Sequence, residues 1–479
     1  MAQDLFRMTL KESQRYLSSK ENFDLLVGSL SLRAKEIDPK VKAYLSFNPN
    51  GKNFSDKSPK PGQKLWGVPV SIKDNICTDG WETTCSSKIL KGYIPPYDAT
   101  VVRKLKENGA YLFAKCNMDE FAFGSSCESS AYHPSVNPWD LSRVPGGSSG
   151  GSAACVAADE AICSLGTDTG GSIRQPASLC GVVGMKPTYG RVSRFGLVAF
   201  GSSLDQIGPI TKTVEDNAIL LGAIAGYDPL DSTSVNIEVP DYTKALVKDA
   251  KGLKIGLPRE YFVKGINSEV EAAVREVAKV YKQLGAEIKE ISLPHSKYGI
   301  AVYYVVATAE ASSNLARFDG VEYGYRYNTD DLLEMYVETR DQGFGQEAKR
   351  RILLGTFVLS AGYYDAYYLR AQKVRTLIKK DFENAFKEVD VILSPTSPTT
   401  AFKLGEKTDD PLSMYLSDIY TITVNLAGVP ALSVPCGFDS KGLPIGFQLM
   451  GKYFDETTLY RSAYAYEQTM HWYEKKPKL

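Results

Sequence analysis

The chain has 479 residues, of which 43% are hydrophobic and 23% charged, as in globular proteins with a sizeable core. By length it could hold roughly two to four average domains, although large α/β enzymes often form one unit. Lys+Arg and Asp+Glu number 56 each, so the formal net charge is zero. This excludes a global electrostatic field for gripping nucleic acid or an anionic membrane. Any polyanion would be held locally or by a partner.

The N-terminal residues lack the apolar run of a signal peptide, and no stretch reaches the apolar length of a membrane span. The eight cysteines are scattered, with no Cys-x-x-Cys pair and no zinc spacing. We therefore expect buried free thiols, no metal site, no membrane association, and a cytoplasmic location or an organelle matrix.

The first part of the chain is predicted to be helical up to about residue 45. Residues 48–64 are rich in glycine, proline and lysine, which is typical of a connector. We expect an N-terminal helical segment and connector over residues 1–60, followed by the main domain over residues 61–479.

Apolar alternation predicts a strand within residues 65–76, with Val70 and Ile72 on one face and Ser71 and Lys73 on the other. Helical patterns separate it from the later strand candidates, and this alternation favours an α/β layer fold. The later candidates are residues 110–116, 161–168, 253–258, 286–293, 389–395 and 431–438.

Two helices carry clear start signals. Ser268 and Glu271 have the spacing of a capping box ahead of an apolar stripe, and Asp455 is a candidate cap for the last helix. Residues 300–375 are mostly helical in pattern and rich in tyrosine. We expect a helical insertion beside the sheet at about residues 300–410.

Residues 145–181, PGGSSGGSAACVAADEAICSLGTDTGGSIRQPASLCG, contain two glycine pairs that are each followed by serine. Taken alone, such a pair is most often a tight turn before a closely packed helix. A phosphate-binding loop is disfavoured, because no lysine follows the glycines and the G-x-G-x-x-G pattern is absent.

A nucleophile elbow is a second alternative, since GGSSG fits G-x-S-x-G. The preceding residues are loop-like, whereas an elbow follows a hydrophobic strand. The three histidines, His133, His295 and His471, stand in no recognisable catalytic setting. A Ser-His-Asp triad is therefore disfavoured but stays open.

A third alternative needs no histidine. A helix is predicted to start near Ser172, where free backbone N–H groups favour developing negative charge. The amides of Thr169, Gly170, Gly171 and Ser172 could form an oxyanion hole. The base could be Lys73, because burial favours a neutral amine. Without other signals, Lys73 is a solvated cation at a strand end.

The same 37-residue stretch resembles the motif of the amidase signature family, and residues 67–76, GVPVSIKDNI, resemble its upstream lysine motif. The resemblance extends over about residues 60–470. It implies an α/β fold with a central mixed β-sheet covered by helices on both faces. It also implies that Ser172 is the nucleophile, Ser148 a bridging serine typically in a cis peptide, and Lys73 the general base acting through Ser148.

Residues 73–90 and 349–378 lie outside the signature and resemble the A subunits of glutamyl-tRNA(Gln) amidotransferases. That resemblance implies glutamine hydrolysis, with the ammonia passing through an enclosed tunnel to a partner subunit in a heterotrimer. The partner would hold the tRNA, ATP and Mg²⁺, while a small third subunit would clasp the two. No cofactor is expected in this chain. The acceptor would be Glu-tRNA(Gln) and, in some such assemblies, also Asp-tRNA(Asn).

Glutamine carries an α-carboxylate and an α-ammonium, so its pocket needs a cation and an anion. The resemblance places the cation at Arg351, with Arg350 as the alternative, and the anion at Asp418. Tyr303 is expected to line the pocket, with Tyr304 as the alternative. Taken without the family, these residues are surface ion pairs or packed aromatics. Two other functions stay open: a stand-alone amidase acting on small amides, and a non-catalytic scaffold.

Overall fold

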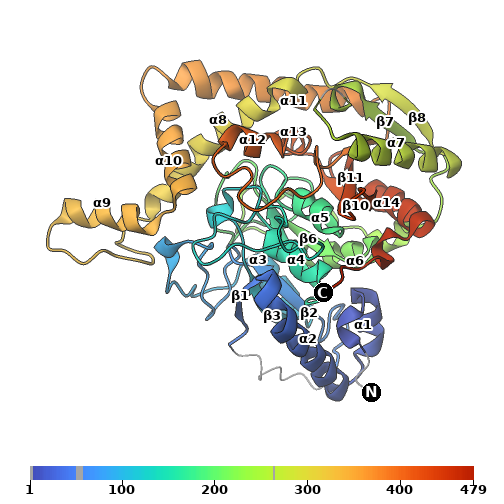
Figure 1. The fold of residues 1–479 in the computed structure, drawn as a ribbon, viewed down its shortest axis with the longest axis horizontal. Helices are drawn as coiled ribbons and strands as arrows, with labels where there is room; N and C mark the ends of the chain where they lie inside the picture. Colours follow the sequence, from blue (N-terminus) through green and yellow to red (C-terminus); the bar gives the residue numbers. More distant parts are fainter. Residues whose placement is uncertain (1–3, 50–57, 263–264) are drawn as a thin grey trace.

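One mixed β-sheet runs through the molecule (Figure 1). The computed structural model describes residues 4–49, 58–262 and 265–479. Within them, eleven strands pair in the order β1-β3-β2-β4-β6-β5-β10-β11-β9-β7-β8. The strands are β1 (Tyr44–Phe47), β2 (Pro69–Lys73), β3 (Tyr111–Cys116), β4 (Cys163–Asp168), β5 (Val183–Lys186), β6 (Gln206–Thr211), β7 (Lys254–Pro258), β8 (Glu287–Ile291), β9 (Val391–Pro395), β10 (Ala431–Phe438) and β11 (Pro444–Gly451).

Helices cover the sheet on both faces, as expected for an α/β layer fold (Figure 1). They are α1 (Leu10–Tyr16), α2 (Lys20–Val41), α3 (Thr100–Glu107), α4 (Gly150–Ala157), α5 (Arg174–Cys180), α6 (Val214–Ile224), α7 (Ser268–Gln283), α8 (Gly299–Asn314), α9 (Leu332–Gly343), α10 (Gln346–Leu359), α11 (Arg370–Ala385), α12 (Pro411–Leu416), α13 (Ile422–Ala427) and α14 (Glu456–Met470). A π-helical turn, Tyr364–Leu369, connects α10 to α11.

The seven predicted strands are all present, as β2, β3, β4, β7, β8, β9 and β10. The prediction missed β1, β5, β6 and β11. Strands β1 and β5 have only four residues each, and β6 contains a glycine and a proline, so their sequences carry weak strand signals.

The N-terminal segment is helical as predicted from α1 to α2, and then turns into β1, which pairs with β3 at the edge of the sheet. Leu26 and Leu30 of α2 share one hydrophobic core with Val70 of β2. Residues 50–57 of the expected connector lie outside the described residues. The division of the chain near residue 60 stays a prediction.

The capping prediction for α7 is wrong in detail. Asn267, and not Ser268, is the cap, because its side-chain oxygen accepts the N–H groups of Glu269 and Val270. The cap of α14 is confirmed: Asp455 accepts the Thr458 N–H. Helices α8 to α11 fill the first part of the region expected as a helical insertion.

The cysteines, the apolar helices and the possible metal ligands can be compared with the sequence predictions. All eight cysteines are free and buried, as predicted. In the described residues, no helix is long and apolar enough to cross a membrane, and no cluster of three or more His, Cys, Asp or Glu side chains could hold a metal ion.

The candidate site forms where two parallel strands end side by side. Strands β2 and β4 pair in parallel, so Lys73 at the end of β2 and Asp168 at the end of β4 reach the same edge. Helix α4 starts just after Ser148 and packs on β2 and β4. The topology therefore brings together three segments that are far apart in the sequence.

Candidate active site

Lys73 is completely buried and is held by three hydroxyl groups. Its Nζ lies 2.7 Å from Ser148 Oγ, 2.9 Å from Ser149 Oγ and 2.9 Å from Thr167 Oγ1. The interpretation of Lys73 as a solvated strand-end cation is therefore wrong. Burial lowers the pKa of Lys73 to about 7, even though Asp119 and other acidic neighbours act to raise it. A substantial fraction of this amine is neutral near pH 7.

Ser148 follows a cis peptide bond between Gly147 and Ser148, the feature that the family resemblance implied. Glycine is required before it, because a Cβ on Gly147 would lie 2.1 Å from Asp119 Oδ2 and 2.6 Å from the Ser126 nitrogen. The Ser149 N–H donates to the Ser172 carbonyl at 3.1 Å. This backbone bond places the two glycine–serine turns next to each other.

Ser172 lies at the turn between β4 and α5 and is 8% exposed, whereas Lys73 and Ser148 are fully buried. The turn is held by Asp168, whose carboxylate accepts the N–H groups of Gly171 and Ile173. Arg174 bonds both oxygens of that carboxylate at 3.0 Å. Burial acts to raise the pKa of Asp168, but Arg174, Lys186 and Asn425 together outweigh it and lower the pKa to about 2.

Helix α5 begins at Arg174, close to Ser172 as predicted, and the non-helical backbone of Gly171, with a φ of +141°, keeps the helix from starting earlier. The Asp168 carboxylate accepts two N–H groups ahead of this helix. The Gly171 N–H is thus already used at 2.9 Å. Among the four amides expected for an oxyanion hole, those of Thr169, Gly170 and Ser172 stay as candidates.

Arg351, on α10, is buried and enclosed by aromatic rings. Its guanidinium carbon lies 5.3–5.7 Å from the ring centres of Phe123, Phe200, Tyr304 and Tyr415. Its Nε bonds a Glu347 carboxylate oxygen at 2.8 Å. The side chain lines a cavity of about 250 Å³. A buried cation beside a cavity is suited to bind a carboxylate.

Arg350 lines the same cavity as Arg351 but is the weaker candidate, because it is less buried. Its side chain is half exposed and pairs with the other oxygen of Glu347. The structure therefore brings Arg351 into the interior and leaves Arg350 at its edge.

Asp418 is buried and lacks part of its hydrogen bonding. Ser125 donates to one carboxylate oxygen, while the other oxygen, Oδ1, has no hydrogen-bond partner among the residues that the structure describes. Burial raises the pKa of Asp418 to about 7. The backbone carbonyl of Asp418 accepts from Thr421, whose hydroxyl also contacts the Gly170 carbonyl at 2.7 Å. Thr421 thus links Asp418 to the Gly170–Gly171 turn that precedes Ser172.

Tyr303 and Tyr304 on α8 point to different places. A Cβ on Gly170 would lie 2.8 Å from Tyr303 Oη, so the Tyr303 ring covers the glycine turn. Tyr304 stacks on Tyr415 at 3.8 Å instead, as part of the enclosure of Arg351. Of the two tyrosines, Tyr303 is therefore the one whose ring lies against the loop that carries Ser172.

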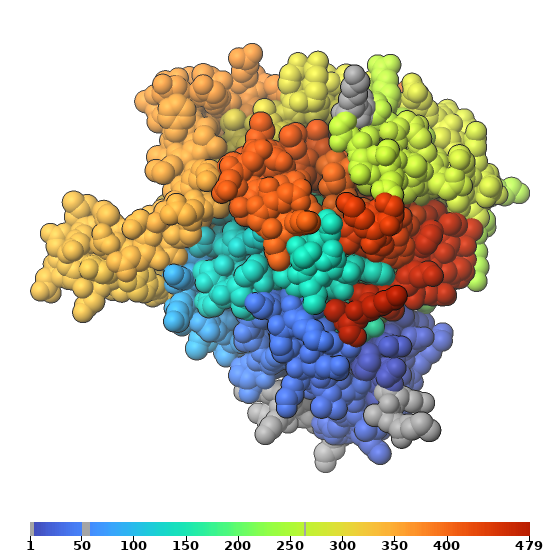
Figure 2. Space-filling view, viewed as in Figure 1, coloured from blue at the N-terminus to red at the C-terminus, as the bar shows by residue number. Residues whose placement is uncertain are grey.

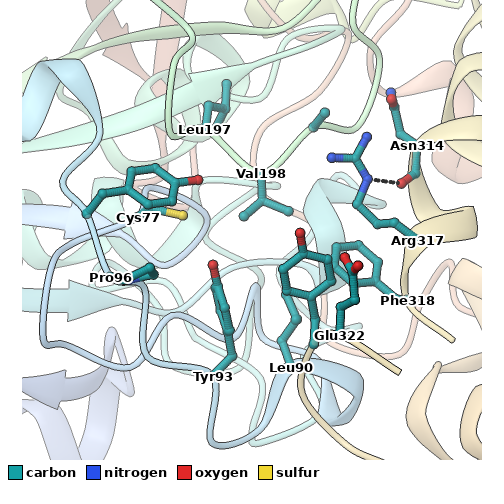
Figure 3. Close-up of a pocket in the computed structure, with 13 residues that line it drawn as sticks. Cys77, Leu90, Tyr93, Pro96, Leu197, Val198, Asn314, Arg317, Phe318 and Glu322 are labelled. Carbon is teal, nitrogen blue, oxygen red and sulfur yellow. Dashed lines mark hydrogen bonds between the residues drawn. The ribbon is translucent and has the colours of Figure 1, made fainter. Parts of the chain in front are cut away.

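The histidines have no place in this arrangement. In the part of the chain that the structure describes, neither Ser148 nor Ser172 hydrogen-bonds to a histidine, and His295 pairs with Asp381 elsewhere. A larger pocket of about 420 Å³ is also separate (Figure 3). None of its 13 lining residues is a sequence-predicted site residue.

Sequence reasoning missed several residues that hold the site. Ser149 and Thr167 bond Lys73, and Asp205 accepts the Thr169 hydroxyl at 2.6 Å. Ser149 stands in the same glycine–serine motif as Ser148, so the motif contained a signal for it. Thr167 and Asp205 carry no comparable sequence signal, because their roles depend on sheet pairing and on a loop that folds back.

Known proteins resemble this chain over nearly its whole length. A family model described as Amidase matches residues 26–460. The A subunit of the glutamyl-tRNA(Gln) amidotransferase of Thermodesulfovibrio yellowstonii is 60% identical over 93% of this chain and 94% of that protein. The protein of the same name from Geobacillus thermodenitrificans is 60% identical over 99% of this chain and 100% of that protein.

A solved structure agrees with these sequence matches. The crystal structure of the A subunit of the glutamyl-tRNA(Gln) amidotransferase from Thermotoga maritima is 48% identical, covers 97% of this chain and 95% of that chain, and superposes with a TM-score of 0.83. Sequence, fold and the family model therefore agree. The chain belongs to the amidase family.

Proposed function

We propose that this chain is the glutamine-hydrolysing A subunit of a glutamyl-tRNA(Gln) amidotransferase. The observation that carries the chemistry is the buried contact of 2.7 Å between Lys73 Nζ and Ser148 Oγ. The choice of glutamine as substrate and of a multi-subunit amidotransferase as the assembly rests on the names of the relatives at 60% identity.

Lys73 acts as a neutral general base in this proposal. A neutral amine has two N–H donors and one lone pair, and three hydroxyl oxygens surround it. The Ser149 hydroxyl donates its hydrogen to the Thr167 carbonyl at 3.0 Å, so its oxygen can only accept a hydrogen bond from Lys73. Thr167 Oγ1 takes the second N–H. The lone pair then faces Ser148, which passes on the proton of Ser172.

The acyl transfer follows from this proton path. Ser172 Oγ attacks the side-chain amide carbon of glutamine as its proton moves through Ser148 to Lys73. The oxyanion is stabilised by the free amides among Thr169, Gly170 and Ser172. Lys73 returns the proton to the leaving nitrogen, ammonia departs, and water hydrolyses the γ-glutamyl ester to release glutamate.

Two groups position the substrate. Arg351 would bind the α-carboxylate, and the unpaired Oδ1 of Asp418 would accept from the α-ammonium. Tyr303 would limit the space over the Gly170 turn. These are opposite charges set apart from the nucleophile, as free glutamine requires.

The ammonia would be used by a partner subunit that holds ATP, Mg²⁺ and the glutamyl-tRNA(Gln), with a small third subunit completing the heterotrimer in the cytoplasm. Conversion of aspartyl-tRNA(Asn) would use the same ammonia. The zero net charge of this chain supports the view that tRNA binds mainly to the partner.

The test is transfer of isotope from amide-¹⁵N glutamine to glutamyl-tRNA(Gln) by the full complex with ATP and Mg²⁺. Labelled glutaminyl-tRNA is the expected product. Rapid hydrolysis of small amides by the chain alone, with no label transferred by the complex, would identify a stand-alone amidase instead. Absence of both activities and of labelling by a serine-directed acyl probe would leave only a scaffold.

A further inference from the structure

An arm projects from the body of the molecule between α8 and α10. It comprises residues 319–343, and the first part of α9 (Leu332–Gly343) projects beyond the body of the molecule (Figures 1 and 2). Its root is attached to the body, because the Tyr325 N–H donates to the Ile89 carbonyl at 2.8 Å. The arm is therefore an ordered structure that extends away from the domain.

The helix of the arm carries exposed apolar side chains. Leu332 is 63% exposed, Leu333 72% and Val337 54%. Leu333 and Val337 are four residues apart and so share a helix face. Met335 and Thr339 face inward and are buried against the arm itself. Neighbouring exposed apolar residues on a projecting helix are typical of an interaction surface.

The arm is strongly acidic although the whole chain is neutral. Seven of its 25 residues are Asp or Glu, and two are arginine. One of the two, Arg340, directs its guanidinium to the carbonyls of Leu315 and Phe318 at the root. This charge repels nucleic acid and anionic membranes. The matching surface is an apolar groove rimmed by lysine and arginine.

A pocket of about 420 Å³ lies at the root of the arm (Figure 3). Glu322 of the arm lines it, together with Arg317 just before the arm and with Leu90 and Tyr93 of the body. A protein that binds the root of the arm would therefore also contact this pocket, because Glu322 belongs to both.

We propose that residues 319–343 dock on the tRNA-binding partner subunit of the amidotransferase. This inference rests on the proposed function. A protein that holds tRNA must present lysine and arginine to the phosphates, and further basic residues beside that contact would be complementary to the acidic arm. Charge complementarity speeds the encounter, and the leucines supply the buried contact.

The test is the dissociation constant between the full chain and the purified partner subunit. Leu332→Ser with Leu333→Ser should weaken binding at least tenfold. The matched control is Leu25→Ser with Leu32→Ser on α2, where the leucines are 52% and 70% exposed, and it should bind as wild type. Asp330→Lys with Glu338→Lys should weaken binding and reduce its salt dependence.

Labelling of Ser172 by an acyl probe and the thermal unfolding midpoint should be unchanged in every variant, since none of the substituted residues lines the Arg351 cavity or bonds Lys73. Equal binding by the arm variants and the control would overturn the inference. So would dimerisation of the wild-type chain that Leu332→Ser with Leu333→Ser abolishes, because the occupant would then be a second copy. If wild type neither binds the partner nor transfers nitrogen, the proposed function itself fails.

Discussion

Lys73 Nζ lies 2.7 Å from Ser148 Oγ, and both side chains are fully buried. A lysine in such a place loses hydration, so its neutral form is favoured and its pKa falls to about 7. The pair comes from two segments separated by 75 residues, which meet because α4, starting just after Ser148, packs on β2 and β4. The proposed base and the proposed relay hydroxyl are therefore already in contact.

Removal of the base tests this pair directly. Lys73→Ala should lower kcat for glutamine by about 10² to 10⁴, the usual contribution of general base catalysis. Lys73→Met fills the same space and should be equally inactive while keeping the unfolding midpoint closer to wild type. Steady-state ammonia release and thermal unfolding measure both effects. Activity of Lys73→Met near the wild-type level would remove Lys73 from the mechanism.

The pH dependence has a defined direction. Because the pKa of Lys73 is lowered to about 7, the neutral base is present above pH 7 and is lost as pH falls below it. We expect kcat to fall about tenfold per pH unit on the acid side and to level off above pH 8. A kcat that keeps rising up to pH 10 would mean an ordinary lysine pKa and would contradict this account.

Neighbouring arginines provide a matched pair of variants. Arg351→Ala should raise KM for glutamine by about 10- to 100-fold, because a hydrogen bond to a charged group contributes about 1.5–3 kcal/mol. Arg350→Ala should change KM less than about twofold, because its side chain, which lines the same cavity, is half exposed and its ion pair is screened by solvent. Both variants lose a partner of Glu347, so the difference isolates the buried guanidinium. Equal effects would reverse the assignment.

Asp418 should control binding of the ammonium group. Asp418→Asn keeps the shape but removes the charge, so KM should rise about tenfold or more while kcat changes little. The pKa of Asp418 is raised to about 7, so wild-type KM should increase as pH falls below 7. The variant should lose that dependence. A KM profile identical to wild type would exclude Asp418 from the glutamine pocket.

Seven strands and the position of the candidate site could be predicted from local sequence, whereas β1, β5, β6, β11 and the side chains that support the site could not. Strand β2 has strong alternation, and the glycine–serine motif identifies Ser148 and Ser172. Arg174 stands six residues after Asp168, but no local pattern says that its guanidinium turns back to clamp that carboxylate. The cap of α7 was misplaced by one residue, because Asn267 and Ser268 are both good caps.

Partners across long sequence distances were the least predictable. Thr421, at the start of α13, bonds the Gly170 carbonyl, 251 residues away. Such a contact depends on how α13 packs, and neither composition nor spacing reports it. The resemblance to a family could supply Arg351, Asp418 and Tyr303, but only the structure separates Tyr303 at the turn from Tyr304 beside Arg351.

The most direct measurement is ammonia release from L-glutamine by wild type and by Ser172→Ala, with the partner chains present. Ser172 Oγ is the proposed nucleophile, so wild type should release ammonia and the variant should release none above the uncatalysed background, with the same unfolding midpoint. Equal release by both proteins would show that Ser172 is not the nucleophile, and the proposed mechanism would be wrong.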